Sequence, residues 1–207
     1  MAQLYFIYST MGGGKSLELL KTAHIYECQG KKVLLFTSEK DTRYANLASD
    51  AKIGKIVARI GLEKDAWLIE RVNCYDLAIQ YKPNCILVDE AQFLTEPVVL
   101  DLARIVDELD IPVVCFGLKN DFMNQLFEGS RALLLYADKI QELKAVCYYC
   151  DRKATMNMRL QNGRPVFEGE QILVGGSVGD AIESEITYVP VCRKCYMSFK
   201  KQALVRE

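Results

Sequence analysis

The stretch YSTMGGGKS at residues 8–16 decides the fold expected for this chain. It fits the phosphate-binding loop G-x-x-x-x-G-K-[ST] at Gly14, Lys15 and Ser16, while Ser9 occupies the position of the first glycine. In such a loop the backbone N–H groups surround the phosphates, the lysine reaches the β- and γ-phosphates, and the hydroxyl holds Mg²⁺. We therefore predict a nucleotide-phosphate site at this loop.

The flanks of the loop support this prediction. Leu4–Tyr8 is a short apolar run that is typical of a buried strand. After the loop, apolar residues recur at roughly helical spacing, and this pattern ends near Gly30. The order strand, loop, helix places a helix N-terminus, with its partial positive charge, against an anion. The alternative is a glycine-rich turn that binds no ligand.

Strands and helices alternate as far as residue 116. The second predicted strand, Val33–Thr37, completes a β-α-β unit with a right-handed crossover. The segments that follow are a loose helical pattern at Ala66–Tyr81, a strand at Cys85–Val88, an amphipathic helix at Glu96–Leu109 and a strand at Pro112–Phe116. We expect an α/β fold: a P-loop NTPase-like, mainly parallel sheet flanked by helices.

Acidic residues follow two of the predicted strands. Asp89 and Glu90 come directly after Cys85–Val88, where a first carboxylate can hold Mg²⁺ and a second acid is a candidate base. Asp41 and Arg43 follow the second strand, and the carboxyl ends of parallel strands lie at the same edge of a sheet as the phosphate loop. The alternatives are an acidic strand cap and an exposed charged loop.

Composition narrows the class of partner. The chain has 207 residues, which is enough for one domain, or for one domain with a small appendage. Its 26 basic and 27 acidic residues leave a net charge of −1, so no global field attracts it to nucleic acid or to an anionic membrane. It has no apolar stretch of membrane-spanning length and no signal-peptide layout at its N-terminus. We expect a cytoplasmic protein with neither nucleic acid nor membrane as its main partner.

Two C-x-x-C pairs, Cys147/Cys150 and Cys192/Cys195, lie in the last third of the chain. Together they supply the four tetrahedral thiolate ligands of a closed structural Zn²⁺ site. The 41 residues between the pairs exceed the spacing of a compact zinc ribbon, so the intervening segment must loop out. A redox role is the alternative for a C-x-x-C pair. We expect the other four cysteines to be buried thiols: Cys28, Cys74, Cys85 and Cys115.

The motifs together resemble those of one family, the type II (cytosolic-type) thymidine kinases. The resemblance covers nearly the whole chain, and its most specific part is the strand end D-E-x-Q-F joined to a C-terminal zinc-bound lasso. The matching segments are residues 9–16, 41–43 (DTR), 89–93 (DEAQF), Gly117-Leu118 with Phe122 and Phe127, both cysteine pairs, and 188–195 (YVPVCRKC).

This resemblance implies an activity and an organisation. The implied reaction is ATP-dependent phosphorylation of the 5′-hydroxyl of thymidine, a step of nucleotide salvage that supplies DNA synthesis. The implied assembly is a homotetramer with one structural zinc per subunit and with thymidine triphosphate (dTTP) as a feedback ligand. We predict a P-loop ATP-binding α/β domain at residues 1–142 and a zinc-binding lasso domain at residues 143–207.

The resemblance also implies residue roles. Glu90 would accept the proton of the 5′-hydroxyl, Arg43 would neutralise charge in the transition state, and Lys15 would hold the ATP phosphates. Ser16 and Asp89 would position Mg²⁺. The other nucleotide-binding positions would be Ser9, Thr10, Met11, Gly12, Gly13, Gly14, Asp41, Ala91 and Gln92. The thymidine-binding positions would be Met11, Phe93, Leu118, Phe122, Phe127 and Tyr188, with the lasso segment Gln171, Ile172, Leu173, Val174 and Gly175; Asn157 is a further candidate.

A function of another class stays open on the residues alone. A P-loop ATPase can carry a zinc ribbon that binds nucleic acid or a protein partner. Basic residues near the cysteine pairs, such as Arg193 and Lys194, favour that function, whereas acidic residues between the pairs, such as Glu168 and Glu170, oppose it.

Overall fold

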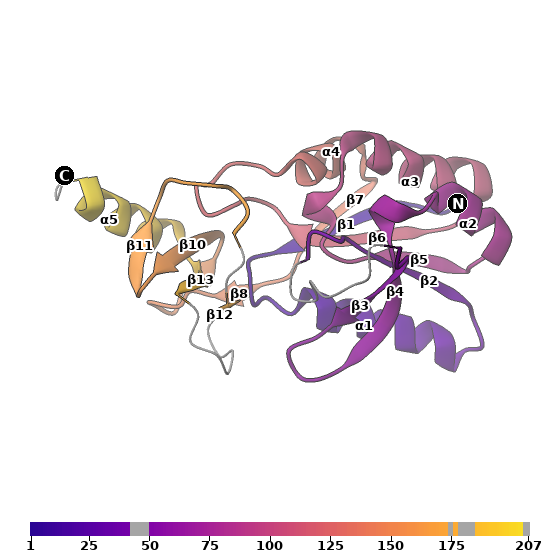
Figure 1. Ribbon diagram of the computed structural model, residues 1–207, viewed down its shortest axis with the longest axis horizontal. Coiled ribbons are helices and arrows are strands. Elements are labelled where there is room, and N and C mark those ends of the chain that lie inside the picture. Colours follow the sequence, from indigo (N-terminus) through magenta and orange to yellow (C-terminus); the bar gives the residue numbers. More distant parts are fainter. Residues whose placement is uncertain (42–49, 174–175, 178–184, 205–207) are drawn as a thin grey trace. The chain divides into compact units, whose positions relative to one another are not determined.

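The computed structural model describes residues 1–41, 50–173, 176–177 and 185–204 (Figure 1). The chain divides into two compact units. Unit 1 comprises Met1–Tyr8, Gly14–Gly117 and Glu128–Glu142, and unit 2 comprises Ser9–Gly13, Leu118–Phe127 and Leu143–Glu207. The chain therefore passes from one unit to the other within the phosphate loop.

Unit 1 is built on a seven-stranded sheet with the strand order β3-β4-β2-β5-β6-β1-β7. The pairs β1–β7, β2–β4, β2–β5 and β5–β6 are parallel, and β3–β4 is antiparallel. The mainly parallel sheet confirms the predicted fold class. The strands are β1 (Leu4–Ser9), β2 (Val33–Thr37), β3 (Ile53–Val57), β4 (Glu63–Leu68), β5 (Cys85–Val88), β6 (Val113–Leu118) and β7 (Lys139–Glu142).

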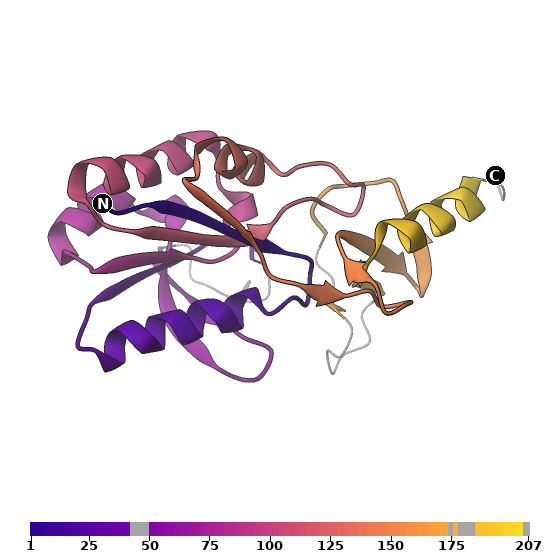
Figure 2. The same cartoon turned by 180° about the vertical axis from the view of Figure 1, so that it is seen from behind.

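Helices cover both faces of this sheet (Figures 1 and 2). Helix α1 (Lys15–Cys28) packs on one face, where Leu19, Leu20 and Ala23 join the core. The opposite face carries α2 (Cys74–Tyr81), α3 (Glu96–Leu109) and α4 (Glu128–Tyr136), and two 3₁₀ turns precede α2 and α3: η2 (Ile69–Arg71) and η3 (Ala91–Phe93). The apolar face of α3 is buried at the helical spacing that the sequence predicted.

The predicted helical pattern at Ala66–Tyr81 is wrong in its first half. Strand β4 runs to Leu68 because Trp67 pairs with Phe36 on β2 and with Ile53 on β3. Helix α2 begins only at Cys74, after the Asn73 side chain caps it by accepting the N–H of Asp76 at 3.0 Å. Pairing with distant strands therefore overrides the local periodicity. The strands β3 and β7 and the helix α4 were not predicted from the sequence.

Unit 2 contains a four-stranded sheet with the order β11-β10-β13-β12 and a two-stranded hairpin. Asn162 and Gly163 both have positive φ, the backbone conformation of the tight turn that joins β10 to β11. The hydrophobic core of unit 2 includes Met158, Val189 and Tyr196. The elements are β8 (Ala145–Val146), β9 (Lys153–Ala154), β10 (Met156–Gln161), β11 (Arg164–Val166), β12 (Gly176–Ser177), β13 (Ile186–Val191) and α5 (Arg193–Leu204).

Three of the four isolated cysteines are buried as expected. Burial raises the pKa of the Cys74 thiol to about 12 and that of Cys85 to about 11, and it raises the pKa of Cys115 as well. The prediction is wrong for Cys28, which is exposed near the end of α1 with its Sγ 3.4 Å from Nε2 of His24. Cys28 lies on a face of α1 that points away from the sheet, which the sequence periodicity did not resolve.

No helix among the described residues is long and apolar enough to cross a membrane.

Substitution of Gly129 tests how closely α4 packs against the turn η3. A Cβ atom at Gly129 would lie 2.4 Å from the carbonyl oxygen of Ala91 and 2.8 Å from that of Leu94, so only glycine lets α4 approach the turn η3. We expect Gly129→Ala to destabilise the fold by about 1–3 kcal/mol through overpacking. Thermal unfolding should show this as a fall in Tm of about 2–4 °C for each kcal/mol.

The matched control is Arg131→Ala, because Arg131 is exposed on the same helix. It should leave Tm nearly unchanged. A Gly129→Ala variant that is as stable as the parent chain would contradict the close packing of α4.

Candidate active site and metal centre

The phosphate loop leads directly into α1. Gly12 and Gly14 have φ of +72° and +81°, a left-handed conformation that glycine adopts without a steric penalty. The N–H of Gly13 donates to the carbonyl of Thr10 at 3.2 Å, which closes a tight turn. Lys15 is the first residue of α1 and is buried. The helix N-terminus and a lysine ammonium therefore occur together at one place, as anion binding requires.

Side chains of unit 2 fix the first half of the loop. The hydroxyl of Ser9 donates to the carbonyl of Leu143 at 2.7 Å, and the N–H of Met11 donates to Oδ1 of Asn157 at 2.8 Å. Asn157 is itself held, because its Nδ2 donates to the carbonyl of Asn120 at 2.8 Å. Ser9, which replaces the first glycine of the motif, therefore anchors the loop through its hydroxyl group. Asn157 contacts the loop backbone through its side chain.

A hydroxyl and a carboxylate meet at the end of β5. Ser16 Oγ donates to Oδ2 of Asp89 at 2.8 Å, and the N–H of Asp89 donates to the carbonyl of Phe36 at 2.9 Å. Asp89 is almost fully buried, so its carboxylate is held in one place. Magnesium in nucleotide sites is bound through one or two carboxylates together with substrate phosphates. The Ser16 and Asp89 oxygens fit that donor set.

Glu90 has an unusual backbone conformation. Its φ of +52° lies in the left-handed region, which costs a non-glycine residue about 1–3 kcal/mol. Nε2 of Gln92 donates to Oε2 of Glu90 at 2.6 Å and so fixes the direction of the carboxylate. Glu90 itself is only half-buried. An oriented and accessible carboxylate can accept a proton from a hydroxyl group that is placed within hydrogen-bonding distance.

Gly117 allows the strand next to this turn to come close. A Cβ atom at Gly117 on β6 would lie 2.9 Å from the backbone N of Gln92 and 3.0 Å from its Oε1. Ala91 and Gln92 are buried under this contact, and Phe93, also in η3, is half-buried. The turn that carries Glu90 is therefore closely packed against both Gly117 and Gly129.

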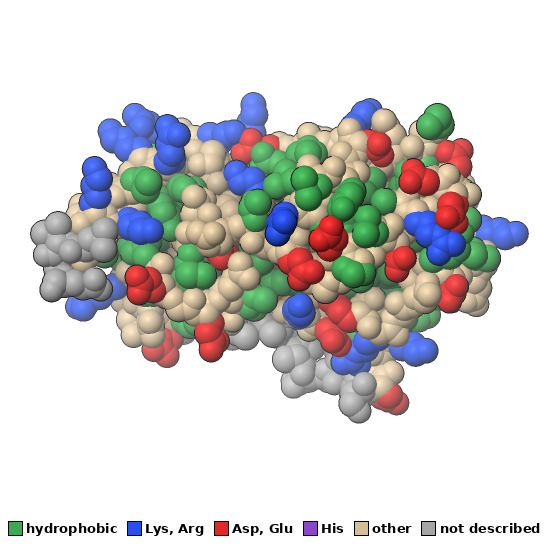
Figure 3. Space-filling view, turned by 90° about the horizontal axis from the view of Figure 1, so that it is seen from above, with side chains coloured by type: hydrophobic (Ala, Val, Ile, Leu, Met, Phe, Trp, Pro, Cys, Tyr) green, Lys and Arg blue, Asp and Glu red, His purple; other side chains and the backbone are tan. Residues whose placement is uncertain are grey.

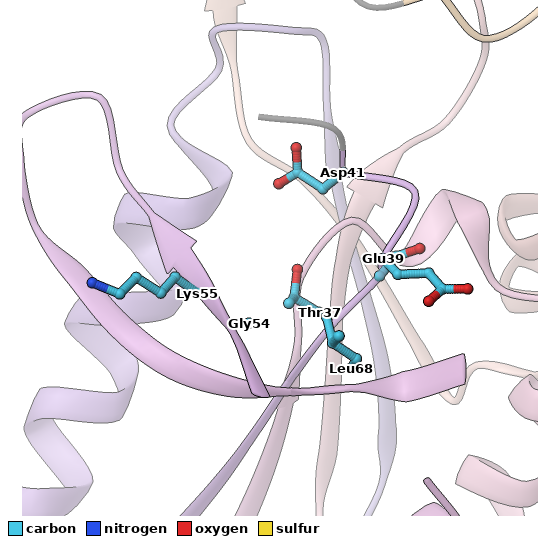
Figure 4. A pocket seen from close by; sticks show the side chains of 7 residues that line it. Thr37, Glu39, Asp41, Gly54, Lys55 and Leu68 are labelled. Carbon is cyan, nitrogen blue, oxygen red and sulfur yellow. The ribbon is translucent and has the colours of Figure 1, made fainter. Parts of the chain in front are cut away.

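Asp41 follows β2 at the edge of a small hollow (Figure 4). Glu70, which sequence reasoning did not single out, shapes this turn. It accepts the hydroxyl of Ser38 and, at Oε2, the N–H of Glu39 at 2.9 Å. Arg43 lies outside the described residues. The hollow is lined by Thr37, Ser38, Glu39, Asp41, Gly54, Lys55 and Leu68.

Apart from the half-buried Met11, the predicted thymidine-binding positions of unit 2 fall into two groups. Leu118, Phe122, Phe127 and Tyr188 are buried. Gln171, Ile172 and Leu173 have exposed side chains, while Val174 and Gly175 lie outside the described residues. Arg159 connects these groups by hydrogen bonds and ring contacts. No pattern in the sequence singles out Arg159 for this role, since its partners lie far away in the chain.

The four paired cysteines form one cluster. The Sγ atoms of Cys147, Cys150, Cys192 and Cys195 all lie within 4.8 Å of one another. Cys150 Sγ lies 3.7 Å from both Cys192 Sγ and Cys195 Sγ. Four sulfurs at ~2.3 Å from a tetrahedral zinc would be about 3.8 Å apart, so the spacing fits Zn²⁺. The N–H of Cys195 points at Cys192 Sγ and holds the pKa of the Cys192 thiol below its usual value, at about 7.

This geometry distinguishes between the two roles considered for a C-x-x-C pair. A redox site needs two cysteines that can form one disulfide, whereas here both pairs converge on a single point. Cys147 and Cys192 are buried, and Cys150 and Cys195 are half-buried. The cluster is suited to a closed structural metal site.

Thymidine kinases resemble this chain over almost its whole length. The model of the thymidine kinase family matches residues 2–196. A thymidine kinase of Lactococcus lactis subsp. lactis is 53% identical over 199 residues, which cover 95% of this chain and 97% of that protein. A thymidine kinase of Enterococcus faecalis is also 53% identical over 199 residues, covering 95% of each chain. Among solved structures, a replication initiator DnaA bound to AMPPCP and single-stranded DNA matches 69% of this chain and 40% of that chain, with a TM-score of 0.43 and 16% identity.

Cys192→Ser tests the metal centre. Removing one of four thiolates leaves an incomplete tetrahedral site, so we expect less than one zinc per chain and a lower Tm. Atomic emission spectroscopy measures the zinc, and thermal unfolding measures the stability.

Cys28→Ser is the matched control, because Cys28 is a cysteine on the exposed face of α1, outside the cluster. It should keep the full zinc content. Stoichiometric zinc in Cys192→Ser would argue against the four-cysteine site.

Proposed function

Because the chain belongs to the thymidine kinase family and is therefore a nucleoside kinase, we propose that it transfers the γ-phosphoryl group of ATP to the 5′-hydroxyl of thymidine. The product is thymidine monophosphate, which places the reaction in pyrimidine deoxynucleoside salvage for DNA synthesis. The observation that carries the proposal is the 53% identity to thymidine kinases over 95% of this chain.

The nucleotide phosphates are bound by the loop and the start of α1. Lys15 and the helix N-terminus supply positive charge, and the left-handed Gly12 and Gly14 let the backbone approach the phosphates closely. Ser16 and Asp89 would hold Mg²⁺ through the two oxygens that lie side by side. When bound, Mg²⁺ would neutralise charge on the phosphate oxygens. The remaining nucleotide-binding residues of this proposal are Ser9, Thr10, Met11, Gly13, Asp41, Ala91 and Gln92.

Glu90 acts as the general base in this proposal and takes the proton of the 5′-hydroxyl. The single histidine of the chain, His24, is exposed on α1 beside Cys28. It lies about 12 Å along the helix from Ser16, which contacts Asp89 at the end of β5. The carboxylate of Glu90 is instead oriented by Gln92 and held in a strained backbone conformation. Arg43 is assigned the neutralisation of charge in the transition state.

Recognition of thymidine is assigned to buried aromatic side chains and to the lasso. Phosphoryl transfer demands in-line positioning of the acceptor, so the nucleoside must be held firmly. A base bound by backbone hydrogen bonds gives strong discrimination, because an analogue that lacks the matching groups leaves polar atoms unpaired. The proposed contacts are Met11, Phe93, Leu118, Phe122, Phe127 and Tyr188, with residues 171–175.

The fully assembled enzyme is proposed to be a homotetramer with one structural zinc per chain and with dTTP as feedback inhibitor. Exposed apolar side chains on the helices support self-association, among them Ile25 on α1 and Leu135 on α4. Figure 3 shows apolar side chains exposed among charged ones on the face seen from above. Light scattering that gave the mass of a single chain would contradict the tetramer. A cytoplasmic location agrees with a four-thiolate site, because a reducing compartment keeps thiols reduced.

A direct assay tests the activity. The zinc-loaded chain is incubated with ATP, Mg²⁺ and thymidine, and the products are separated to detect thymidine monophosphate and ADP in equal amounts. A chain that hydrolyses ATP only when DNA is added, and that leaves nucleosides unchanged, would overturn the proposal in favour of a nucleic-acid-dependent ATPase.

Glu90→Gln tests the base. The amide keeps the size of the side chain but cannot accept a proton, so we expect turnover to fall by at least ~10²-fold. Thymidine binding, measured by calorimetry, should be nearly unchanged. Asp107→Asn is the control, because it makes the same chemical change at an exposed position of α3. If Glu90→Gln turned over at the parental rate, Glu90 would be removed from this role.

A further inference from the structure

Arg159 is a buried cation in the middle of strand β10. Only 2% of its surface is exposed, although arginine is among the residues least often buried. Burying a charge is costly unless hydrogen bonds satisfy the group, so a buried guanidinium implies a specific set of partners. The proposed reaction assigns no role to Arg159.

The partners of Arg159 are residues of the proposed thymidine site. Nε donates to the hydroxyl of Tyr188 at 2.9 Å. Nη2 donates to the carbonyl of Glu170 at 2.8 Å and to that of Gln171 at 3.3 Å. The face of the guanidinium lies 3.5 Å from the ring centroid of Phe122, within the range of a cation–π contact. One side chain therefore contacts two aromatic rings and the start of the lasso.

The segment 170–173 has two further anchors. The Tyr188 hydroxyl, which accepts from Arg159, donates to the carbonyl of Leu173 at 3.2 Å. Nε2 of Gln171 donates to Oδ2 of Asp121 at 2.8 Å. Asp121 is buried, and its Oδ1 accepts the N–H of Gln125 at 2.8 Å, so this anchor is itself fixed. The backbone of 170–173 is thus held at three carbonyls and one side chain, even though the side chains at 171–173 are exposed.

We propose that Arg159 is a positioning residue for the nucleoside: it fixes the backbone of residues 170–173 and the rings of Phe122 and Tyr188 before thymidine binds. The proposal rests on the proposed function, because it assumes that this segment and these rings contact thymidine. Arginine suits the task, since its planar fork donates in two directions while its flat face stacks on a ring, whereas lysine is a point charge without a fork or a flat face.

Loss of the Arg159 contacts should weaken the affinity for thymidine and leave the affinity for ATP unchanged. If the segment adopts its binding conformation in a tenth of the molecules, the apparent affinity for thymidine falls about tenfold. The phosphate loop is held by other groups, the carbonyl of Leu143 and the side chain of Asn157, so ATP binding should be spared. The predicted signature is a rise in KM for thymidine without an equal rise in KM for ATP.

The experiment compares Arg159→Ala and Arg159→Lys with the parent chain and with Arg164→Ala, a control at an exposed arginine on the neighbouring strand β11. We expect KM for thymidine to rise at least about tenfold in both Arg159 variants. KM for ATP should stay within about twofold, and zinc content should be unchanged. Lysine should not restore affinity, because it retains the charge but lacks the planar fork.

Chemical rescue separates positioning from general stability. Methylguanidinium can occupy the space left in Arg159→Ala, stack on Phe122 and donate to the Tyr188 hydroxyl and the Glu170 carbonyl. It should lower KM for thymidine in this variant, and methylammonium at the same concentration should not. A lack of rescue, together with equal rises in both KM values, would reduce Arg159 to a structural role and overturn the proposal.

Tyr188→Phe provides a second route if Arg159→Ala does not fold. It keeps the ring but removes the hydroxyl that joins Arg159 to Leu173. We expect KM for thymidine to rise several-fold, as the loss of a hydrogen bond of about 1 kcal/mol implies. Unchanged KM for thymidine in Arg159→Lys and Tyr188→Phe would overturn the proposal. A parent chain inactive on thymidine would instead overturn the proposed function.

Discussion

The hydrogen bond from the Ser16 hydroxyl to the Asp89 carboxylate joins two segments that lie 73 residues apart in the chain. It exists because β1 and β5 belong to one mainly parallel sheet, whose strands end at a common edge. The loop after β1 and the acids after β5 are brought together by that topology alone. The proposed binding of phosphate and Mg²⁺ in unit 1 depends on this constraint, since neither segment carries a complete donor set by itself.

Close packing then constrains the turn that carries Glu90, the proposed general base. Glu90 sits in a left-handed conformation at the start of η3, and this turn is held by Gly117 on β6 and Gly129 on α4. A side chain at either glycine would collide with backbone or amide atoms of residues 91–94. The strain at Glu90 persists because its surroundings leave the turn no other conformation. Two glycines far from Glu90 in sequence therefore determine how closely the turn that carries it is packed.

Unit 1 is stabilised mainly by a large apolar core, whereas unit 2 has a smaller core together with buried polar contacts and a cluster of thiols. Its small core lies within two short sheets and one helix, and the four-cysteine cluster links the β8–β9 hairpin to the start of α5. A structural metal there would stabilise a unit too small to rely on apolar burial alone. Arg159 adds a second fixed point, because a buried guanidinium retains its position only while its hydrogen-bond partners keep theirs.

The sequence by itself determined the fold class, the phosphate loop, the acidic end of β5 and the four cysteines, because each is a local pattern whose chemistry depends on spacing along the chain. Where β4 ends and α2 begins, and that β3, α4 and β7 exist, depended on pairing and packing with distant residues, as Trp67 shows. The same holds for the site: Glu70, Gly129 and Arg159 act through partners that no local pattern identifies. Only the tertiary structure decides which buried polar groups meet, because their partners are far apart in sequence and near only after folding.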